Sequence, residues 1–442
     1  MKLSGWGAYP RIETELAAPR DEAELAEFLV RGDAVARGNG RAYGDAAIGR
    51  RRTLSTRHFA HMLDFDAERG WLTADSGVLL SDVISAFLPR GWFPLVTPGT
   101  KYVTLGGMVA SDVHGKNHHK DGSFQTCVEW FDLMTPDGRV QRCSRTENSE
   151  LFFWTFGAMG MTGVVLRVCM RLLPVETGWI RQKSIVAANL AEAIRVFEDN
   201  LDATYSVAWI DCVAKGADLG RSIIMLGEHA TIGQIPPDDR HRPLHLPVRG
   251  KLSVPFTPPA FCLNRYTLRA FNALYFRMGA RKAAKQGGVS LEHWDSYFYP
   301  LDSILGWNRI YGRRGFLQYQ CVIPLAQAEA GMSELMEATA EAGAGSFLAV
   351  LKRFGAQESR ISFPMEGYTL ALDFPASERN LALIGRLEDI AIAHGGRFYL
   401  AKDAHLTAAR FRASEPRAED FARTHRQFHP MMGSALSDRI GL

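Results

Sequence analysis

The stretch Arg37-Gly38-Asn39-Gly40-Arg41-Ala42-Tyr43-Gly44-Asp45 decides the fold, and it directly follows Ala34-Val35-Ala36. The apolar residues predict a short buried strand. The glycines predict a loop whose backbone N–H groups can approach a phosphate, because glycine has no side chain in the way. Arg37 and Arg41 can add charge-assisted hydrogen bonds, whereas a solvent-exposed turn is the alternative. The glycine spacing does not fit GxGxxG, which disfavours a Rossmann dinucleotide site.

Two further glycine-rich segments follow. The second runs from Thr97-Pro98-Gly99-Thr100 through Leu105-Gly106-Gly107 to His114-Gly115-Lys116-Asn117-His118-His119, and the third is Phe156 to Val165. The adjacent histidines suit either a zinc site or a solvated loop, but no carboxylate or cysteine lies at ligand spacing, so we predict no metal. The third segment precedes a β-branched strand, where glycine often marks only a bulge.

Length and composition narrow the class of protein. A chain of 442 residues is longer than one hydrophobic core usually serves, so we expect two domains. A net charge of +3 is too small to indicate nucleic-acid binding. Six scattered cysteines without a CxxC motif favour a reducing compartment, and we predict a cytoplasmic protein. We expect neither a signal peptide nor a membrane-spanning helix, because long apolar runs are missing.

Hydrophobic periodicity predicts an α+β fold. The first part carries helices that begin at Asp21 and Ser81 and strands at residues 72–75 and 128–134. From about residue 178 longer strands follow, at residues 205–212, 222–226, 316–323, 346–351 and 368–373, with helices at residues 190–197, 325–342 and 377–394. This order predicts a second domain built on an antiparallel sheet that helices cover on one face.

A segment near residues 230–290 differs from its surroundings, and we expect a flexible insert. It begins rich in proline and ends in a helical pattern. The pattern has two groups of residues, apolar Leu268, Phe271, Leu274, Tyr275 and Phe276 and basic Arg265, Arg269, Arg277, Arg281, Lys282 and Lys285. Such a helix is typical of a segment that binds an anionic membrane surface. The alternative is that the apolar residues pack against the second domain or a second copy.

Together the three glycine-rich segments occur in the order and spacing of the FAD-binding domain of the vanillyl-alcohol oxidase and p-cresol methylhydroxylase superfamily. Within it, the chain resembles the decaprenylphosphoryl-β-D-ribose 2-oxidases. The motifs that carry this resemblance are Gly5-Trp6-Gly7, the stretch 36–45, Thr97-Pro98-Gly99-Thr100, His114 to His119 and Gly395-Gly396-Arg397-x-Tyr399-x-Ala401-Lys402-Asp403. The resemblance covers nearly the whole chain and weakens in the insert.

The resemblance implies a two-domain flavoprotein with a split FAD-binding domain. Its parts are residues 1–177 and a return segment at 396–442, and the antiparallel-sheet substrate domain spans 178–395. FAD is expected to be non-covalent, because Arg41-Ala42-Tyr43 offers no histidine or cysteine as a tether. The implied cofactor-binding residues are Arg37, Gly38, Asn39, Gly40, Arg41, Ala42, Tyr43, Gly44, Thr97, Pro98, Gly99, Thr100, Thr104, Gly106, Gly107, Ser111, His114, Gly115, Asn117, His118, Gly160, Gly163, Val164, Tyr399, Ala401 and Lys402.

Oxidation of an alcohol by flavin needs a group that takes the hydroxyl proton. The flavin ring accepts the hydride, and a cation near the ring stabilises the negative charge that it gains. By resemblance, Lys402 and Lys116 are the catalytic lysines. Gln318 and Gln320 alternate along one strand, so their amides face the same side and suit sugar hydroxyls. The implied substrate-binding residues are Lys116, Trp209, Phe298, Arg309, Gln318, Gln320, Lys352, Phe354, Thr369 and Ala371. Thr369 and Ala371 replace the asparagine and cysteine of mycobacterial members.

The resemblance implies oxidation of the ribose 2-hydroxyl of a polyprenyl-phosphoryl-β-D-ribose to a ketone. An NAD(P)H-dependent short-chain reductase would then reduce the ketone to the arabinose form. The enzyme would meet its lipid substrate at the inner face of the membrane. Two alternatives stay open at this point. One is a soluble sugar-alcohol or aldonolactone oxidase on the same fold, and the other is a lipid-phosphate binding protein without catalysis.

Overall fold

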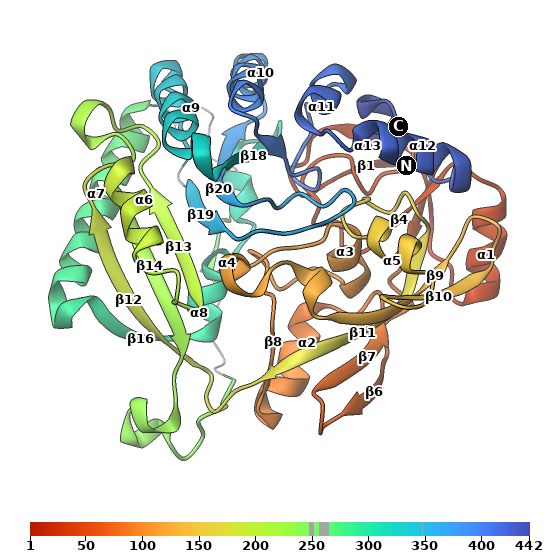
Figure 1. Ribbon diagram of the computed structural model, residues 1–442, viewed down its shortest axis with the longest axis horizontal. Helices are drawn as coiled ribbons and strands as arrows, with labels where there is room; N and C mark the ends of the chain where they lie inside the picture. The colour runs from red at the N-terminus through yellow and green to blue at the C-terminus, as the bar shows by residue number, and fades with distance from the viewer. Residues whose placement is uncertain (247–251, 256–264, 347) are drawn as a thin grey trace.

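Two large sheets organise the computed structural model, which describes residues 1–246, 252–255, 265–346 and 348–442 (Figure 1). A six-stranded antiparallel sheet lies in the first lobe, with the order β10-β9-β11-β7-β6 and β8 paired to β11. An eight-stranded sheet, β16-β12-β14-β13-β19-β20-β18-β21, builds the second lobe. Helices pack on the faces of both sheets, which confirms the predicted α+β class.

The first lobe also contains a small parallel sheet, β3-β5-β4, which carries the first glycine loop at the end of β4. Its strands are β3 Glu15–Ala17, β4 Ala34–Arg37 and β5 Arg52–Ser55. The larger sheet has β6 Met62–Asp66, β7 Trp71–Asp75, β8 Trp92–Pro94, β9 Val128–Met134, β10 Val140–Ser144 and β11 Val164–Pro174. The helices are α1 Glu22–Val30, α2 Leu80–Phe87, α3 Leu105–Ala110, α4 His118–Asp121 and α5 Ser149–Thr155. Strands β1 Lys2–Ser4 and β2 Arg11–Glu13 form a separate hairpin.

The two predicted helix starts have different outcomes. Asp21 caps α1, because its side chain accepts a hydrogen bond from the Glu24 N–H at 2.8 Å. The prediction that Ser81 caps α2 is wrong, since this helix begins at Leu80. The N–H groups of Leu80 and Ser81 donate to the carbonyls of Val103 and Lys101 instead, so a neighbouring loop satisfies the helix start.

The second lobe is built on the long antiparallel sheet that the alternating pattern predicts. Its strands are β12 Trp179–Ala187, β13 Tyr205–Ile210, β14 Ser222–His229, β16 Val289–His293, β18 Phe316–Pro324, β19 Val350–Phe354, β20 Gly367–Pro375 and β21 Arg397–Phe398. Its helices are α6 Leu190–Glu198, α7 Arg265–Ala284, α8 Trp294–Phe298, α9 Ala328–Ala342 and α10 Glu378–Ala393. The short strands β15 Leu252–Ser253 and β17 Ile304–Leu305 pair with each other.

Helices contact both faces of this sheet, so the prediction of a single covered face is corrected. The apolar residues of α6 share one core with Ala208 of β13. On α7, Tyr275 packs against Trp209, with ring centroids 4.7 Å apart. Because adjacent residues of a strand point to opposite faces, α6 and α7 cover opposite sides of the sheet. Helix α7 therefore covers the face of the sheet to which the Trp209 side chain points.

One predicted strand is displaced along the chain. Strand β19 begins at Val350 rather than at Ser346. The Ser346 hydroxyl accepts hydrogen bonds from the N–H groups of Leu348 and Asp373, at 3.1 and 3.0 Å. A side chain that binds two backbone groups in this way replaces the regular ladder, so the strand starts later.

The C-terminal segment returns to the beginning of the chain, and Figure 1 shows the blue helices beside the red strands. Strand β21 still pairs with β18, after which the chain continues into helices α11 Ala408–Ser414, α12 Ala418–Phe428 and α13 Ala435–Ile440. Arg439 of α13 binds both carboxylate oxygens of Asp45, at 2.6 and 3.0 Å, and Asp403 at 2.7 Å. These contacts support the predicted split domain, whose exact bounds stay a prediction.

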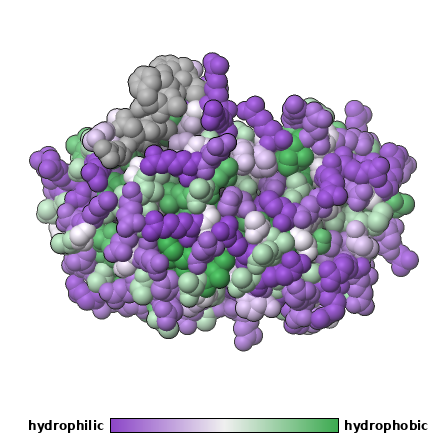
Figure 2. Space-filling model, turned by 90° about the horizontal axis from the view of Figure 1, so that it is seen from above, coloured by the Kyte–Doolittle hydropathy of each residue, from purple (hydrophilic) through white to green (hydrophobic). Residues whose placement is uncertain are grey.

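The outer surface over helices α9, α10 and α11 is largely hydrophilic, with smaller hydrophobic areas between charged side chains (Figure 2). Among the described residues, no helix is long and apolar enough to cross a membrane. Of the six cysteines, Cys262 lies outside the described residues, and the other five are buried free thiols.

The buried carboxylate of Asp112 joins the two lobes. It follows α3 and accepts hydrogen bonds from the Ser123 hydroxyl at 2.7 Å and the Gln125 N–H at 2.9 Å. From the second lobe, the Gln357 amide donates at 3.0 Å, and the Ser362 hydroxyl donates as well. Asp112 also has a φ of +40°, a backbone conformation that aspartate and asparagine tolerate better than alanine.

We expect Asp112→Ala to destabilise the protein by about 3 kcal/mol, because it leaves buried donors without an acceptor and strains the backbone. Asp112→Asn should cost clearly less, since the amide keeps one acceptor and the same conformation. Urea unfolding followed by circular dichroism compares the two. Equal stability of the alanine variant and the wild type would contradict this role.

Candidate active site

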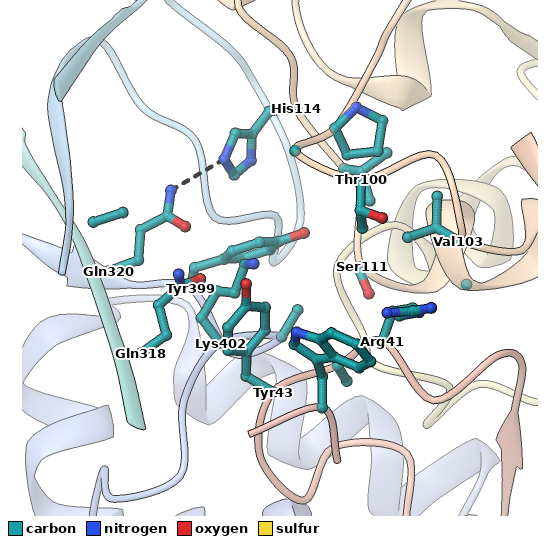
Figure 3. Close-up of a pocket in the computed structure, with 18 of the residues that line it drawn as sticks. Arg41, Tyr43, Thr100, Val103, Ser111, His114, Gln318, Gln320, Tyr399 and Lys402 are labelled. Atoms are coloured by element: carbon teal, nitrogen blue, oxygen red, sulfur yellow. Dashed lines mark hydrogen bonds between the residues drawn. The ribbon is translucent and has the colours of Figure 1, made fainter. Parts of the chain in front are cut away.

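A single cavity of about 390 Å³ lies between the lobes and collects most of the predicted site residues (Figure 3). We call it the central cavity. The predicted cofactor residues in its lining are Gly38, Asn39, Gly40, Arg41, Ala42, Tyr43, Thr97, Pro98, Gly99, Thr100, Thr104, Gly106, Gly107, Ser111, His114, Gly115, Gly160, Gly163, Tyr399, Ala401 and Lys402. The predicted substrate residues in its lining are Lys116, Trp209, Phe298, Gln318, Gln320, Lys352 and Ala371.

The first glycine loop presents open backbone donors to the central cavity. Strand β4 ends at Arg37, and Gly40 has a φ of +64°, which turns the chain sharply. Within the described residues, the N–H groups from Asn39 to Ala42 have no hydrogen-bond acceptor. Successive free N–H groups in such a turn are a common anion site. The Arg41 guanidinium lies 3.9 Å from the centre of the Trp6 ring and adds positive charge beside the loop.

The second glycine segment is fixed by a carboxylate from the other lobe. The Thr100 hydroxyl donates to Asp302 at 2.8 Å, and the Lys101 N–H donates to the same group at 2.9 Å. Thr104 then caps α3 by accepting from the Gly107 N–H at 3.3 Å. Burial raises the pKa of Asp302, while these two hydrogen bonds oppose the shift. Asp302 thus holds the loop at the cavity wall.

Several buried polar atoms around the central cavity have no partner among the described residues. They are Ser76 Oγ, Thr97 Oγ1, His114 Nδ1 and Gln318 Oε1. Unpaired buried donors and acceptors are costly, so they indicate a polar ligand. With the open N–H groups of the first loop, they fit a cofactor that carries both phosphates and a polar ring, as FAD does. Groups of His, Cys, Asp and Glu that could hold a metal are absent from the described part of the chain.

His114 is held as a neutral ring. Its Nε2 accepts a hydrogen bond from the Gln320 amide at 3.1 Å, which is the dashed line in Figure 3. Burial lowers the pKa of His114 far below its usual range, and the nearby ammonium groups of Lys352 and Lys402 lower it further. The proton therefore sits on Nδ1, so His114 offers this cavity a neutral hydrogen-bond donor.

Lys402 and Asp373 form the charged centre of the cavity. The Lys402 ammonium lies 3.7 Å from the centre of the Tyr43 ring. Burial lowers the pKa of Lys402 to about 7, the Asp373 carboxylate raises it, and the Lys352 ammonium lowers it. Burial also raises the pKa of Asp373, which accepts a hydrogen bond from the Gln318 amide at 2.6 Å. A lysine tuned in this way can exchange a proton near neutral pH.

Two more lysines face the same cavity. The Lys116 ammonium donates to the Tyr297 carbonyl and lies 4.2 Å from the centre of the Tyr297 ring. Burial lowers the pKa of Lys116 to about 7, and the charge of Lys352 contributes. Burial also lowers the pKa of Lys352, to about 8. The three lysines predicted for the pocket, Lys116, Lys352 and Lys402, therefore all line the central cavity.

Five predicted cofactor residues lie outside the cavity lining, and they pack behind the segments that form it. The Arg37 guanidinium donates to the Ser4 carbonyl at 2.8 Å, away from the cavity. Asn117 donates to the Leu95 carbonyl and to Asp121, and His118 binds Gln357. Gly44 gives room for the Asp403 carbonyl, because a Cβ there would lie 1.9 Å from that oxygen. Val164 is buried in β11, and Val165 lines the cavity instead.

Three predicted substrate residues also lie outside the lining. Arg309 is exposed and donates to the Val254 carbonyl at 3.1 Å, while Trp307 of the same short helix lines the cavity. Phe354 is fully buried under the ring of His114, at 4.8 Å between centroids. Thr369 is buried, and its hydroxyl accepts from Gln320 at 3.2 Å and donates to the Cys321 carbonyl at 2.8 Å. These three side chains therefore contact neighbouring groups, namely the Val254 carbonyl, the His114 ring and the Gln320 amide, rather than the cavity itself.

Sequence reasoning missed five important lining residues, Trp6, Tyr275, Asp302, Trp307 and Asp373. The alternation Thr369, Ala371, Asp373 along β20 could have placed Asp373 in the cavity. Trp6 was part of a recognised motif but had no assigned role. Asp302 carries no local signal, because its partner Thr100 is about 200 residues away in the chain.

Comparison with known proteins agrees with this geometry. Residues 15–144 match a family described as FAD binding domain. Two L-gulonolactone oxidases match part of the chain, and the one from Scyliorhinus torazame is 35% identical over 115 residues, 26% of each chain. An uncharacterised protein of Streptomyces coelicolor is 32% identical over 377 residues, which cover 83% of this chain and all of that one.

A longer match extends through both lobes. Decaprenylphosphoryl-β-D-ribose oxidase of Mycolicibacterium smegmatis is 32% identical over 454 aligned residues, which cover all of this chain and 97% of that enzyme. The match therefore includes the cavity-facing strands as well as the glycine loops. The chain belongs to the decaprenylphosphoryl-β-D-ribose oxidase family, whose members are FAD-linked oxidoreductases that act on CH–OH groups.

Proposed function

We propose that the protein oxidises the 2-hydroxyl of a polyprenyl-phosphoryl-β-D-ribose to the 2-keto sugar. The observation that carries this proposal is the arrangement of Lys402, Asp373 and Gln318 on the sheet side of the central cavity, opposite the glycine loops. FAD, when bound, supplies the hydride acceptor. The full-length relative is named for a decaprenylphosphoryl ribose substrate, which supports this substrate class.

The residues of this chain perform the proton and positioning steps. Neutral Lys402 accepts the proton of the reacting hydroxyl, and the resulting ammonium is stabilised by Asp373. Gln318 and Gln320 face the cavity from alternate positions of β18 and hold other sugar hydroxyls. Phe298 and Trp209 close the cavity with aromatic surface and exclude water. Lys116 is predicted both as a catalytic and as a substrate-binding lysine, and we assign it to substrate binding, because its ammonium donates to the Tyr297 carbonyl and Lys402 is the lysine beside Asp373.

We propose that FAD is held without a covalent bond. The first glycine loop presents Arg41, Ala42 and Tyr43 to the cavity, and none of them is a histidine or a cysteine. His114 is the histidine in the cavity lining, and its Nε2 already faces Gln320. The cysteines of the described residues are buried outside that lining. Free N–H groups and unpaired polar atoms suffice to bind the cofactor.

An NAD(P)H-dependent short-chain reductase is the partner that we propose for the second half-reaction, because the keto sugar needs reduction to give the arabinose form. We also propose a cytoplasmic enzyme that attaches peripherally to the inner face of the membrane. The reason is physical, since a long prenyl tail does not leave a bilayer. The enzyme must therefore approach the lipid surface.

Helix α7 is the surface that we propose for this attachment, with a corrected set of residues. Leu268 is buried, Tyr275 packs on Trp209, and Phe276 lies under the Arg221 guanidinium. Of the predicted residues, Leu274 is 58% exposed, and Phe271 is 41% exposed and stacks on Tyr275. Met278, which was not predicted, is 61% exposed, so we assign Leu274 and Met278 to the attachment surface. Exposed basic residues share the helix with them, namely Arg269, Arg277, Arg281 and Lys282. Lys282 is paired with Glu292, and the side chain of Arg265 lies outside the described residues.

The alternatives from the sequence have less support. The L-gulonolactone oxidase matches cover about a quarter to a third of the chain, so they do not extend over both lobes as the full-length match does. A binding protein without catalysis would not need Lys402 and Asp373 buried together beside Tyr43. Farnesylphosphoryl-β-D-ribose as a short substrate tests the proposal directly, by anaerobic bleaching of the flavin absorbance.

We expect Lys402→Met to slow this flavin reduction by about 100-fold or more, because the proton acceptor is removed while the side-chain volume is kept. Stopped-flow absorbance measures the rate. Lys120→Met is the control, since this exposed lysine lies outside the cavity. A Lys402→Met enzyme that reduces its flavin at the wild-type rate would rule out the proposed role.

The rate of flavin reduction should rise with pH through the pKa of Lys402, about 7, because the amine must be neutral to accept a proton. The Asp373 carboxylate raises this pKa, so Asp373→Asn should move the rising limb to lower pH. The Lys352 ammonium lowers it, so Lys352→Met should move the limb to higher pH. Shifts in the same direction for both variants, or none, would refute the assignment of the limb to Lys402.

Liposomes with anionic lipid should retain the protein at low salt and release it as salt rises, because each basic residue near such a surface contributes about 1 kcal/mol. Leu274→Glu with Met278→Glu should abolish retention and spare oxidation of the short substrate. Val30→Glu is the matched control, since Val30 is 61% exposed on α1. Co-sedimentation measures binding, and retention of the double variant would exclude α7 as the docking surface.

A further inference from the structure

We propose that Lys352 and Lys116 form a subsite for the phosphodiester group of the substrate. This inference rests on the proposed function, which supplies a sugar joined through phosphate to a lipid. It gives a specific task to two buried cations that take no part in the proton transfer. The shared chemistry is that of a phosphate anion, and the tests below separate a prenyl phosphate from free phosphate.

The register of the sheet places Lys352 at one end of a polar surface. Lys352 pairs with Thr369, and two residues further along β20, Ala371 lies between Val350 and Gln320. Two residues beyond Ala371, Asp373 pairs with Gln318. Successive pairs on one face are about 6.6 Å apart, because a strand rises about 3.3 Å per residue. A sugar over the Gln320 row then has the Lys402–Asp373 pair on one side and Lys352 on the other.

Among the residues that the structure describes, the positive charge at the Lys352 end has no counterion. Within the described residues, the Lys352 ammonium makes no hydrogen bond or ion pair, and the centre of the Phe354 ring lies 5.7 Å away. Lys116 donates to a neutral backbone carbonyl. The two carboxylates of the cavity lining are engaged elsewhere, Asp302 with Thr100 and Asp373 with Gln318. Two buried cations without an anion are costly, so a ligand phosphate would stabilise both.

The surroundings of Lys352 suit the other half of the phosphodiester. Trp209 pairs with Val350, which shares a sheet face with Lys352, and Tyr275 of α7 packs on Trp209. An apolar chain attached to the phosphate therefore meets aromatic surface directly. Tyr275 is itself 42% exposed, so this surface continues from the cavity to the outside. Trp209 lies in the same row of the sheet as Gln320, through Ala371 and Val350, and is the diagonal neighbour of Lys352 on the adjacent strand. A sugar over Gln320, a phosphate at Lys352 and a tail on the Trp209–Tyr275 surface are therefore neighbours on one face of the sheet.

Protonation supports the same assignment. Burial lowers the pKa of Lys116 and of Lys352, and the charge of Lys352 lowers that of Lys116 further. A bound anion has the opposite effect and raises both pKa values. Binding of a prenyl phosphate at pH 8 should therefore take up protons, and its affinity should fall as the pH rises further.

The kinetic test compares farnesylphosphoryl-β-D-ribose with methyl β-D-ribofuranoside, which lacks the phosphate, on the FAD-loaded enzyme. Lys352→Met should weaken apparent binding of the phosphorylated substrate by about 10- to 100-fold, because a charge-assisted contact is lost. Apparent binding of the unphosphorylated sugar should change little, while its rate should show only the pH shift predicted above for this variant. Lys352→Arg should restore part of the difference in binding. Lys215→Met, at an exposed site, is the control. Equal losses for both sugars would overturn the phosphate assignment.

A binding test stands apart from the reaction itself. Calorimetry in buffers of different ionisation enthalpy measures farnesyl phosphate, farnesol and inorganic phosphate on wild type, Lys352→Met and Lys116→Met. We expect farnesyl phosphate to bind wild type with proton uptake, and each variant to bind it at least 10-fold more weakly. Equal binding by wild type and variants would overturn the subsite. If the subsite binds farnesyl phosphate but the ribose derivative does not reduce the flavin, the proposed reaction fails and the subsite stands. Tight binding of inorganic phosphate alone would instead assign the site to the free ion.

Discussion

Burial of charge in one cavity is the constraint on which the rest of the structure depends. Lys116, Lys352 and Lys402 point their ammonium groups into the same space, and the Asp373 carboxylate lies beside Lys402. Charges removed from water in this way need either a partner or a change of protonation. The large antiparallel sheet provides the rigid support that such groups require, because β18, β19 and β20 fix their spacing through backbone pairing.

The two lobes contribute different groups to the cavity, and both are needed to enclose it. The first lobe contributes loops with open backbone donors and few side chains, while the second contributes the polar strands. Their contact depends on buried carboxylates, since Asp112 gathers donors from both lobes and Asp302 fixes the Thr100 loop. The C-terminal segment adds Lys402 only after β21 has paired with the sheet. Lys402 is therefore placed by both lobes at once.

Local patterns in the sequence predicted much of the fold, and long-range contacts explain what they missed. The alternation in β18 and β20 and the apolar spacing of α6, α9 and α10 depend on neighbours in the chain, so these elements were predicted closely. The start of α2 was mispredicted because carbonyls from residues 101 and 103 replace a side-chain cap. Arg37 looked like a phosphate ligand, but its guanidinium turns to the Ser4 carbonyl. Asp302 and Tyr275 gain their cavity positions through tertiary contacts that leave no local pattern.

Helix α7 contacts the central cavity with one face and exposes the other face to the surroundings of the protein. Its inner face contributes Tyr275 to the cavity wall, and its outer face exposes Leu274 and Met278 beside basic residues. The polyprenyl tail of the proposed substrate is too long to be enclosed, so it must leave the cavity where apolar surface reaches the outside. The Trp209–Tyr275 pair provides such a surface, because Trp209 pairs with Val350 and is the diagonal neighbour of Lys352. For the proposed substrate, the helix that would contact the membrane therefore also borders the path of the tail, which would leave the sugar beside Lys402 and the lipid in the bilayer.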